Sequence, residues 1–401
     1  MSERVSVPPA GWDAGELARL GEALGFGEGR SRYIGGWVRD TLAGVEPGDL
    51  DIGTQLLPDE VRSRADAAGL SVWTSASGLA HGTVGVVVGG KPVEVTTLRR
   101  DVATDGRRAT VAFTTDWRED AARRDFTINA LSADPASGEV HDFFDGAADL
   151  RACVVRFIGD PLQRIAEDHL RILRFFRFHA RFGKGAPEPS AYEACALRAN
   201  DLMALSRERI ADELLKLLAH ADPVPAIALM LARDILKPVL PEITLEGLSR
   251  AEALVSTERT AGVPADPVRR LGALVPPSAA DDIGARLKLS NNHRKRLAAA
   301  ISTTILPPKE LAYRVGLEAA CDRLLLAGDP AAAASLAGWS PPRLPLSGGA
   351  LVKRGLTAGP IVAKALKMVE DRWVSEGFPP PERAEAIADQ VAAELLRAQK
   401  A

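Results

Sequence analysis

Residues 35–54, GGWVRDTLAGVEPGDLDIGT, contain the pattern that decides the fold at the start of this chain. A glycine pair, Gly35 and Gly36, separates an apolar strand end at residues 33–34 from a helix predicted over residues 37–42. Glycines at such a junction let the backbone approach phosphate groups, and Arg39, one turn into the helix, can grip them. The stretch therefore predicts a strand, a phosphate-binding turn and a helix.

Two aspartates close the same stretch. The sequence GDLDIG has the composition of a strand, in which Asp49 and Asp51 would share one face about 7 Å apart while Leu50 and Ile52 anchor the other. Two carboxylates at this spacing repel each other unless a cation lies between them, and Mg²⁺ prefers oxygen ligands. An isolated pair of this kind is more often part of a turn. Together with the glycine turn and the arginine, it predicts a site for a nucleoside triphosphate and a metal.

Length and composition limit the number of domains and the class of protein. The chain has 401 residues, of which 46% are apolar, enough for two to four domains with true cores. It contains no apolar run long enough to span a membrane, and its N-terminus lacks the order of a signal peptide, so we expect a cytoplasmic protein without a membrane partner. Its cysteines match no zinc or disulfide spacing and are expected to be structural; they are Cys153, Cys195 and Cys321.

Strand and helix patterns divide the chain. Alternating β-branched runs lie between helical stretches up to about residue 155, and after residue 160 only helical patterns follow. The net charge of −3 argues against a surface basic throughout, yet residues 156–181 hold six arginines against three acids. A local basic face is therefore expected just after the α/β region.

The motif GGWVRD…DLDIGT resembles the first motif of the nucleotidyltransferase superfamily, and specifically of class II tRNA nucleotidyltransferases, the CCA-adding enzymes and their bacterial poly(A) polymerase relatives. A second motif, RRDFTINAL at residues 123–131, resembles the part of that family that holds the triphosphate and ribose. The resemblance implies an α/β head with a nucleotidyltransferase-type mixed sheet and helices, followed by an all-α neck, body and tail. We place the head at 1–155, the neck at 156–220, the body at 221–300 and the tail at 301–401.

Further site residues follow from this resemblance. Glu94, in the strand PVEVTTLR, has the location of a third, supporting carboxylate, although a solvent-facing strand glutamate is the alternative. In the second motif, Arg124 can form charge-assisted bonds to phosphate, and Asp125 and Asn129 can bind hydroxyl groups, including the 2′-hydroxyl. The polar loop at 100–118 resembles the family's mobile loop for switching from C to A addition.

The stretch EDHLRILRFFRF resembles the family's base-reading motif. On a helix, Asp168 and Arg171 would share one surface with Glu167, and an ordinary salt bridge within the helix is the alternative. Cytosine and adenine both present an exocyclic amine beside a bare ring nitrogen, so an aspartate can accept from the amine while an arginine donates to the nitrogen. Uracil and guanine would leave buried groups unpaired, at a cost on the order of 1–3 kcal/mol each. Arg174, Arg177 and Arg164 are expected to extend this face toward the triphosphate.

The helical half resembles the family less closely. SRERIADELLKLL at 206–218 resembles a motif that braces the base-reading helix. Arg294, Lys295 and Arg296 are candidate phosphate contacts, with a solvated helix end as the alternative. Residues 344–366 resemble the tail signature that contacts the tRNA elbow, but Ala350 and Ala358 depart from it.

The resemblance thus implies template-independent addition of CCA to tRNA 3′ ends from CTP and ATP by two-metal nucleotidyl transfer, with Mg²⁺ as cofactor and pyrophosphate as product. The partners implied are tRNA, CTP and ATP, with no stable protein partner. The alternatives are a poly(A) polymerase, an enzyme adding only CC or only A, a non-catalytic RNA-binding protein, and a transferase acting on a small molecule. The catalytic candidates are Asp49, Asp51 and Glu94, with Asp49 and Asp51 as metal ligands. The nucleotide-binding candidates are Gly35, Gly36, Arg39, Arg124, Asp125, Asn129, Asp168, Arg171, Arg174 and Arg177.

Overall fold

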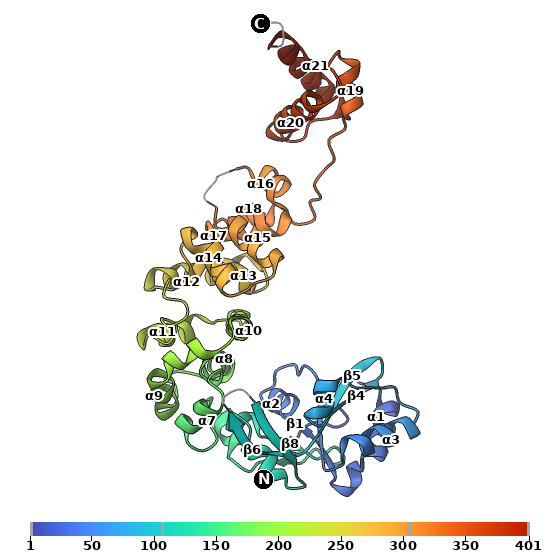
Figure 1. Ribbon diagram of the computed structural model, residues 1–401, viewed down its shortest axis with the longest axis vertical. Helices are drawn as coiled ribbons and strands as arrows, with labels where there is room; N and C mark the ends of the chain where they lie inside the picture. Colours follow the sequence, from blue (N-terminus) through green and yellow to red (C-terminus); the bar gives the residue numbers. More distant parts are fainter. Residues whose placement is uncertain (1–2, 106–107, 303–305, 399–401) are drawn as a thin grey trace. The chain divides into compact units, whose positions relative to one another are not determined.

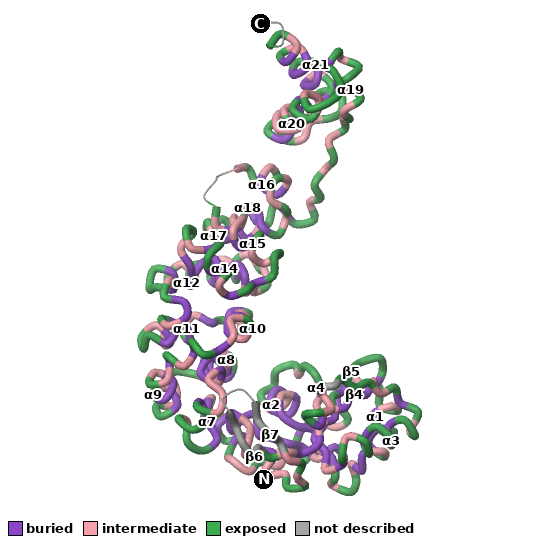
Figure 2. Tube along the Cα trace, viewed as in Figure 1, coloured by how far each residue is buried: buried purple, intermediate pink, exposed green. Residues whose placement is uncertain are grey.

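The computed structural model describes residues 3–105, 108–302 and 306–398 (Figure 1). The chain divides into two compact units, residues 1–241 and residues 242–401. Figure 2 marks the buried residues of both in purple. The expected division into head, neck, body and tail is finer than these two units and stays a prediction.

A seven-stranded mixed sheet organises the first unit, in the order β3-β4-β5-β2-β1-β8-β9. The pair β2 and β5 is parallel, and every other neighbouring pair in this sheet is antiparallel. A separate hairpin consists of β6 and β7. The strands are β1 (Ser31–Ile34), β2 (Asp51–Thr54), β3 (Val72–Trp73), β4 (Thr83–Val88), β5 (Lys91–Thr97), β6 (Arg99–Asp105), β7 (Arg108–Phe113), β8 (Ser132–Ala133) and β9 (Val140–His141).

Helices fill the rest of the first unit. They are α1 (Ala14–Leu24), α2 (Gly36–Leu42), α3 (Pro58–Ala67), α4 (Ala76–Ala80), α5 (Trp117–Ala122), α6 (Gly146–Arg151), α7 (Pro161–Glu167), α8 (Arg171–Phe182), α9 (Pro189–Leu197), α10 (Arg207–Leu218) and α11 (Val224–Ala232), with the 3₁₀ turns η1 (Phe26–Glu28), η2 (Thr127–Asn129) and η3 (Ala199–Ala204).

One face of the sheet forms the main core of the head. Val84 and Val86 of β4 and Ile52 of β2 are fully buried and pack in one cluster with α1, α2 and α3. Because side chains alternate along a strand, Thr83 and Glu94 emerge on the opposite face, where they are not buried. The head therefore has one covered face and one open face, and the polar residues lie on the open one.

The second unit is helical. Its helices are α12 (Leu245–Ala261), α13 (Pro267–Leu274), η4 (Pro277–Ala279), α14 (Ala280–Arg286), α15 (Asn291–Ala300), α16 (Pro308–Val315), α17 (Leu317–Leu326), α18 (Pro330–Ala334), α19 (Gly348–Lys353), α20 (Pro360–Ser375) and α21 (Pro381–Ala398). α20 and α21 enclose a cluster of buried residues that includes Val369, Trp373 and Val391. The region expected to form a tail thus has a core of its own.

The structure corrects the expectation for Arg296, proposed above as a phosphate contact. Its side chain is buried and donates to Asp322 from two nitrogens, Nε at 2.5 Å and Nη2 at 2.9 Å. Arg269 donates to the same carboxylate, so Arg296 belongs to a buried ion cluster that joins α13, α15 and α17. Burial removes it from the surface where RNA would bind.

Candidate active site

The turn between β1 and α2 is shaped by Gly35. Its φ is +64°, a conformation that disfavours any side chain. A Cβ atom at this position would also lie 2.8 Å from Nη1 of Arg124. Gly35 is therefore favoured by its backbone conformation, and a side chain there would also have to displace the guanidinium of Arg124.

The carboxylates come from two neighbouring strands. In the parallel pair of β2 and β5, Asp51 is opposite Glu94, so both side chains lie on the open face. Leu50 and Ile52 are fully buried on the covered face, as expected. The strand prediction for Asp49 was wrong: Asp49 is exposed in a bend, and β2 begins only at Asp51. The chain has not yet joined the sheet at Asp49, so its side chain is not held by strand pairing.

Electrostatics favour a cation beside Asp51. Burial raises the pKa of Asp51 to about 6, and the charges of Glu94 and Asp49 act in the same direction while Arg124 opposes them. A divalent cation would relieve this repulsion, and carboxylates are the donors that a hard cation takes. Within the described residues, no group of three or more His, Cys, Asp or Glu side chains is arranged to hold a metal. The pair Asp51 and Glu94 thus supplies carboxylate oxygens of the kind that a divalent cation binds.

Asp125 and Asn129 form one hydrogen-bonded pair around η2. Asn129 donates from Nδ2 to Oδ1 of Asp125 at 2.8 Å, and Arg174 donates from Nε to Oδ2 of Asp125 at 2.7 Å. Burial by itself would raise the pKa of Asp125, but the charge of Arg174 and these hydrogen bonds outweigh it and hold the pKa below its usual value. Asp125 is therefore a fixed, ionised acceptor.

Arg39 has several partners within the protein. Its side chain is buried, donates from Nε to Asp40 and from Nη1 to Oδ1 of Asn129 at 2.5 Å, and lies over the rings of Phe178 and Phe182. These contacts fix the orientation of the Asn129 amide. Arg39 also lines the cavity described below, and the phosphate contact expected for it stays a prediction.

The base-reading residues do not share a helix, contrary to the expectation. α7 ends at Glu167, Asp168 is extended with φ −153°, and α8 begins at Arg171. Glu167 accepts from Nη1 of Arg171 at 2.5 Å, which holds that guanidinium. The break turns Asp168 away from helical geometry, yet it still lies at the same cavity as Arg171.

One cavity of about 490 Å³ on the open face unites these groups. Its lining includes most of the residues expected from the sequence: Gly35, Gly36, Arg39, Asp51, Glu94, Arg124, Asp125, Asn129, Asp168, Arg171 and Arg174. The lining residues not anticipated there are Ile34, Thr83, Thr96, Arg99, Arg123 and Phe178. The cavity therefore combines paired carboxylates, a glycine turn and converging guanidinium groups.

The sequence and fold are similar to those of known proteins. Residues 31–156 match the family described as "Poly A polymerase head domain", and residues 186–246 match "Probable RNA and SrmB- binding site of polymerase A". CCA tRNA nucleotidyltransferase 1, mitochondrial, of Homo sapiens is 34% identical over 369 residues, covering 86% of this chain and 83% of that protein. The chain belongs to the CCA tRNA nucleotidyltransferase family.

Two further comparisons agree with this membership. The CCA-adding enzyme of Levilactobacillus brevis is 40% identical over 193 residues, which is 48% of this chain and 47% of that protein. The crystal structure of the Bacillus stearothermophilus CCA-adding enzyme in complex with CTP is 26% identical with a TM-score of 0.73, covering 96% of this chain and 99% of that one. Nucleotidyltransferases of this family generally use a divalent metal, consistent with the carboxylates described above.

Two expected residues lie outside the cavity lining: Asp49 and Arg177. Arg177 donates from Nε to Oε2 of Glu213 at 2.6 Å and lies over the ring of Phe178. Arg164 is buried, and it donates to Glu167 and to the backbone carbonyls of Ala122 and Arg124. Both arginines therefore support the cavity wall.

Sequence reasoning missed Arg209 of α10 as a site residue. Its Nη2 donates to both carboxylate oxygens of Asp168, at 3.1 and 2.8 Å. Glu213, one turn further along the helix, pairs with Arg174 and Arg177. The bracing role expected for residues 206–218 is thus confirmed, and the spacing of Arg209 and Glu213 on one helix face was the signal for it.

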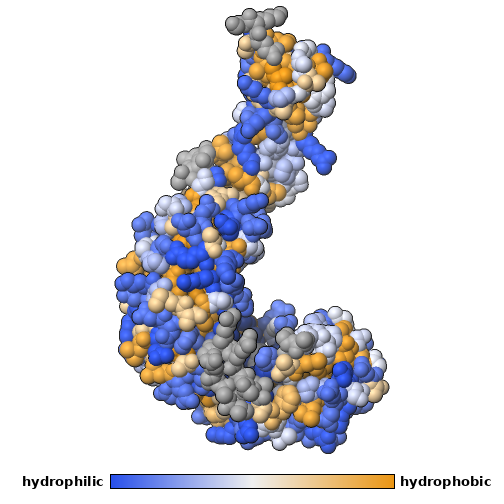
Figure 3. All heavy atoms as spheres, viewed as in Figure 1, coloured by the Kyte–Doolittle hydropathy of each residue, from blue (hydrophilic) through white to orange (hydrophobic). Residues whose placement is uncertain are grey.

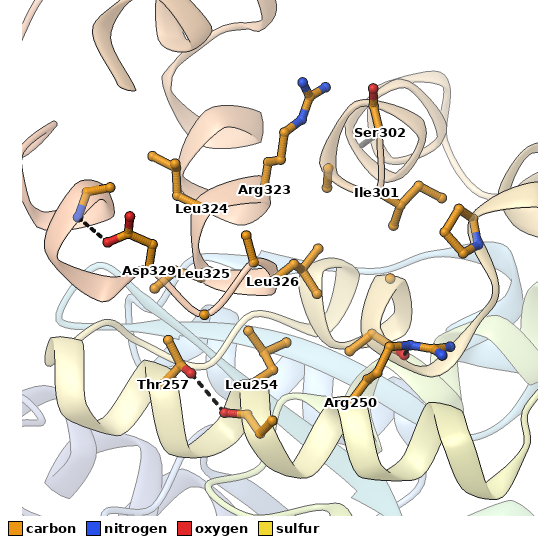
Figure 4. Close-up of a pocket in the computed structure, with 18 of the residues that line it drawn as sticks. Arg250, Leu254, Thr257, Ile301, Ser302, Arg323, Leu324, Leu325, Leu326 and Asp329 are labelled. Carbon is orange, nitrogen blue, oxygen red and sulfur yellow. Dashed lines mark hydrogen bonds between the residues drawn. The ribbon is translucent and has the colours of Figure 1, made fainter. Parts of the chain in front are cut away.

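The loop expected at 100–118 contains the hairpin of β6 and β7, with residues 106–107 outside the described part of the chain. A second cavity, of about 720 Å³, lies in the helical unit between α12, α13 and α17 (Figure 4). Leu254, Leu325 and Ile301 line it, while Arg250 donates to backbone carbonyls of residues 273 and 275. This cavity is lined mainly by apolar side chains, with Arg250 and Arg323 among the polar ones.

The surface seen in Figure 3 mixes hydrophilic and hydrophobic side chains on both units. Among the described residues, no helix has the length and apolar character needed to cross a membrane.

Proposed function

We propose that this protein adds C, C and A to the 3′ ends of tRNA from CTP and ATP, releasing pyrophosphate. The observation that carries the proposal is the position of Asp168 and Arg171 at the same cavity as Asp51 and Glu94. A base-reading pair and a pair of carboxylates in one cavity can select a nucleotide and transfer it without a nucleic-acid template.

The base-reading chemistry depends on fixed partners. Arg209 holds Asp168, and Glu167 holds Arg171, so neither group can swing to suit a different base. Asp168 accepts from the exocyclic amine of cytosine or adenine, and Arg171 donates to the adjacent ring nitrogen. Uracil and guanine present the opposite pattern and would leave both groups unpaired. This pair favours CTP and ATP over UTP and GTP.

The remaining residues position the triphosphate and ribose. Arg124 faces the glycine turn and forms charge-assisted bonds to phosphate oxygens, while Asp125 accepts from a ribose hydroxyl. A 3′-hydroxyl of the RNA then attacks the α-phosphate and pyrophosphate leaves. Asp51 and Glu94 would hold Mg²⁺, with Asp49 beside them. When bound, the metal lowers the pKa of the attacking hydroxyl and neutralises the leaving charge.

The match of residues 31–156 to a poly(A) polymerase head supports a second candidate, addition of A alone. We also propose a cytoplasmic location, although the human relative is named as a mitochondrial protein.

The test is to incubate the protein with Mg²⁺ and tRNA transcripts that end at the discriminator base, with each nucleotide alone and then CTP with ATP, and to sequence the 3′ ends. Ordered C, C, A that stops supports the proposal, and tails of A without CTP support the poly(A) candidate. Asp51→Asn should abolish addition, whereas Asp59→Asn, at an exposed position on α3, should not. No incorporation by the unmodified protein would contradict the proposal.

A further inference from the structure

An exposed tryptophan lies in the same cross-strand row as the carboxylates. Trp73 of β3 is opposite Gly85 of β4, Gly85 is opposite Glu94 of β5, and Glu94 is opposite Asp51 of β2. Residues opposite each other on paired strands project from the same face of a sheet. The Trp73 side chain therefore rises from the open face that carries Glu94 and Asp51.

The indole lies over the backbone of Gly85. A Cβ atom on residue 85 would be 2.0 Å from Cε2 of the Trp73 ring and 2.4 Å from Nε1, so a side chain there would displace the ring. Val84 and Val86 on either side point into the core and are fully buried. Trp73 is 44% exposed and packs outside that core. A large aromatic surface is thus held open to solvent on the sheet face that carries the carboxylates, just outside the cavity lining.

The strand order indicates which of the two substrates would lie near Trp73. The groups that would hold the incoming nucleotide include Gly35, which follows β1, and Asn129, which precedes β8. In the order β3-β4-β5-β2-β1-β8 these lie on one side of Asp51, and β5, β4 and β3 lie on the other. In nucleotidyl transfer the attacking and leaving oxygens are roughly in line, so the acceptor hydroxyl approaches the α-phosphate from the side opposite the pyrophosphate, which the glycine turn would hold. The acceptor RNA is therefore expected over β5 and β4.

The distances between strands agree with an acceptor RNA that lies over β5 and β4. Neighbouring strands lie about 5 Å apart, which puts Gly85 about 5 Å from Glu94 and about 10 Å from Asp51. This separation is comparable to the size of one nucleotide. A base stacked on the indole would leave its own 3′-hydroxyl near the carboxylates.

We propose that Trp73 is the stacking platform for the base at the 3′ end of the acceptor RNA. The inference rests on the proposed function and extends it to the second substrate. Stacking on an aromatic ring tolerates any base because every base has a π-face. Such tolerance suits an enzyme whose acceptor ends first in the discriminator base and then in a newly added C.

The test compares Trp73→Ala, Trp73→Phe and Gly85→Val in the full-length protein, by steady-state kinetics of CTP incorporation. The acceptor is a tRNA transcript with a normal 3′-terminal nucleotide or one whose terminal nucleotide lacks its base. We expect Trp73→Ala to raise the KM for the normal acceptor by about 5- to 100-fold, with the KM for CTP unchanged. Trp73→Phe should restore most of the loss, and Gly85→Val should reproduce it by displacing the ring.

The acceptor without a terminal base separates stacking from a structural role. It should bind the unmodified protein weakly, and Trp73→Ala should have no further effect on it. Leu57→Ala, at a similarly exposed residue (47%) at the start of α3, serves as the matched control and should leave both KM values unchanged.

Two outcomes overturn the inference. An unchanged acceptor KM in Trp73→Ala shows that the indole does not contact RNA, and an equal rise for both acceptors shows a structural role only. If the unmodified protein incorporates nucleotides in either case, the proposed function is still supported and only the inference about Trp73 fails. If the unmodified protein incorporates nothing, the proposed function fails, and the inference fails with it.

Discussion

Replacing Asp51 with asparagine should stabilise the protein in the absence of divalent metal. The pKa of Asp51 is raised from 3.8 to about 6 because the group is partly buried beside Glu94 and Asp49. The ionised carboxylate therefore destabilises the folded state at neutral pH, and Asp51→Asn removes that charge with little change in volume. Asp51, which the proposed reaction requires, therefore lowers the stability of the folded state when no metal is bound.

The magnitude follows from the pKa. A rise from 3.8 to about 6 corresponds to about 3 kcal/mol between folded and unfolded states at high pH. Asp51 keeps contact with solvent, and screening reduces this to about 1–2 kcal/mol. For a unit of this size, each kcal/mol shifts Tm by about 2–4 °C.

The sign of the pH dependence is definite. Because the folded pKa is above the unfolded value, the unmodified protein is penalised most above pH 6, where Asp51 is ionised in both states. As the pH falls from about 6 toward 4, Asp51 becomes protonated in the folded state while it is still ionised in the unfolded state. The difference in stability between Asp51→Asn and the unmodified protein therefore decreases to zero.

The assay is differential scanning calorimetry of the full chain in EDTA between pH 4 and 8, following the transition of the unit that contains the sheet. Asp59→Asn on α3 is the control and should show no such trend, since the side chain of Asp59 is 83% exposed. Added Mg²⁺ should raise the Tm of the unmodified protein more than that of Asp51→Asn. A variant that is less stable at pH 8, or whose advantage grows as the pH falls, would refute the reasoning.

Three other substitutions test the site and its supports. Arg209→Met frees Asp168 from its two hydrogen bonds, and the ratio of kcat/KM for CTP over UTP should fall by about 5- to 100-fold in single-nucleotide incorporation assays. Gly35→Ala, at φ +64°, should raise the KM for CTP and cost about 1–2 kcal/mol in urea denaturation, whereas Gly36→Ala, whose nearest atom would be 3.7 Å away, should do neither. Burial lowers the pKa of His179 in the folded state, so stability should fall as the pH drops below about 6.5. That part of the pH dependence should be absent in His179→Gln, and an identical pH profile for the two proteins would contradict this prediction.

The sequence by itself determined the local pieces of the site. The alternation of valines on β4 and β5 is a period of two, which a strand needs to bury one face, and it is visible without any partner strand. Gly35 was likewise recognisable as part of a glycine turn, which its positive φ bears out, and the motif around Arg124 was recognised by its resemblance to the family. The structural role of such residues can be read from the residue type and its neighbours along the chain.

Tertiary structure decided which of these pieces meet and how they are held. The parallel register that places Asp51 opposite Glu94 joins strands more than forty residues apart, and no local pattern encodes it. Packing also buried Arg39 against two phenylalanine rings and ended α7 before Asp168, whose carboxylate is held by Arg209 from a distant helix. The physical reason is that burial, register and long-range ion pairs depend on which segments pack together, whereas turn and strand propensities depend only on neighbours along the chain.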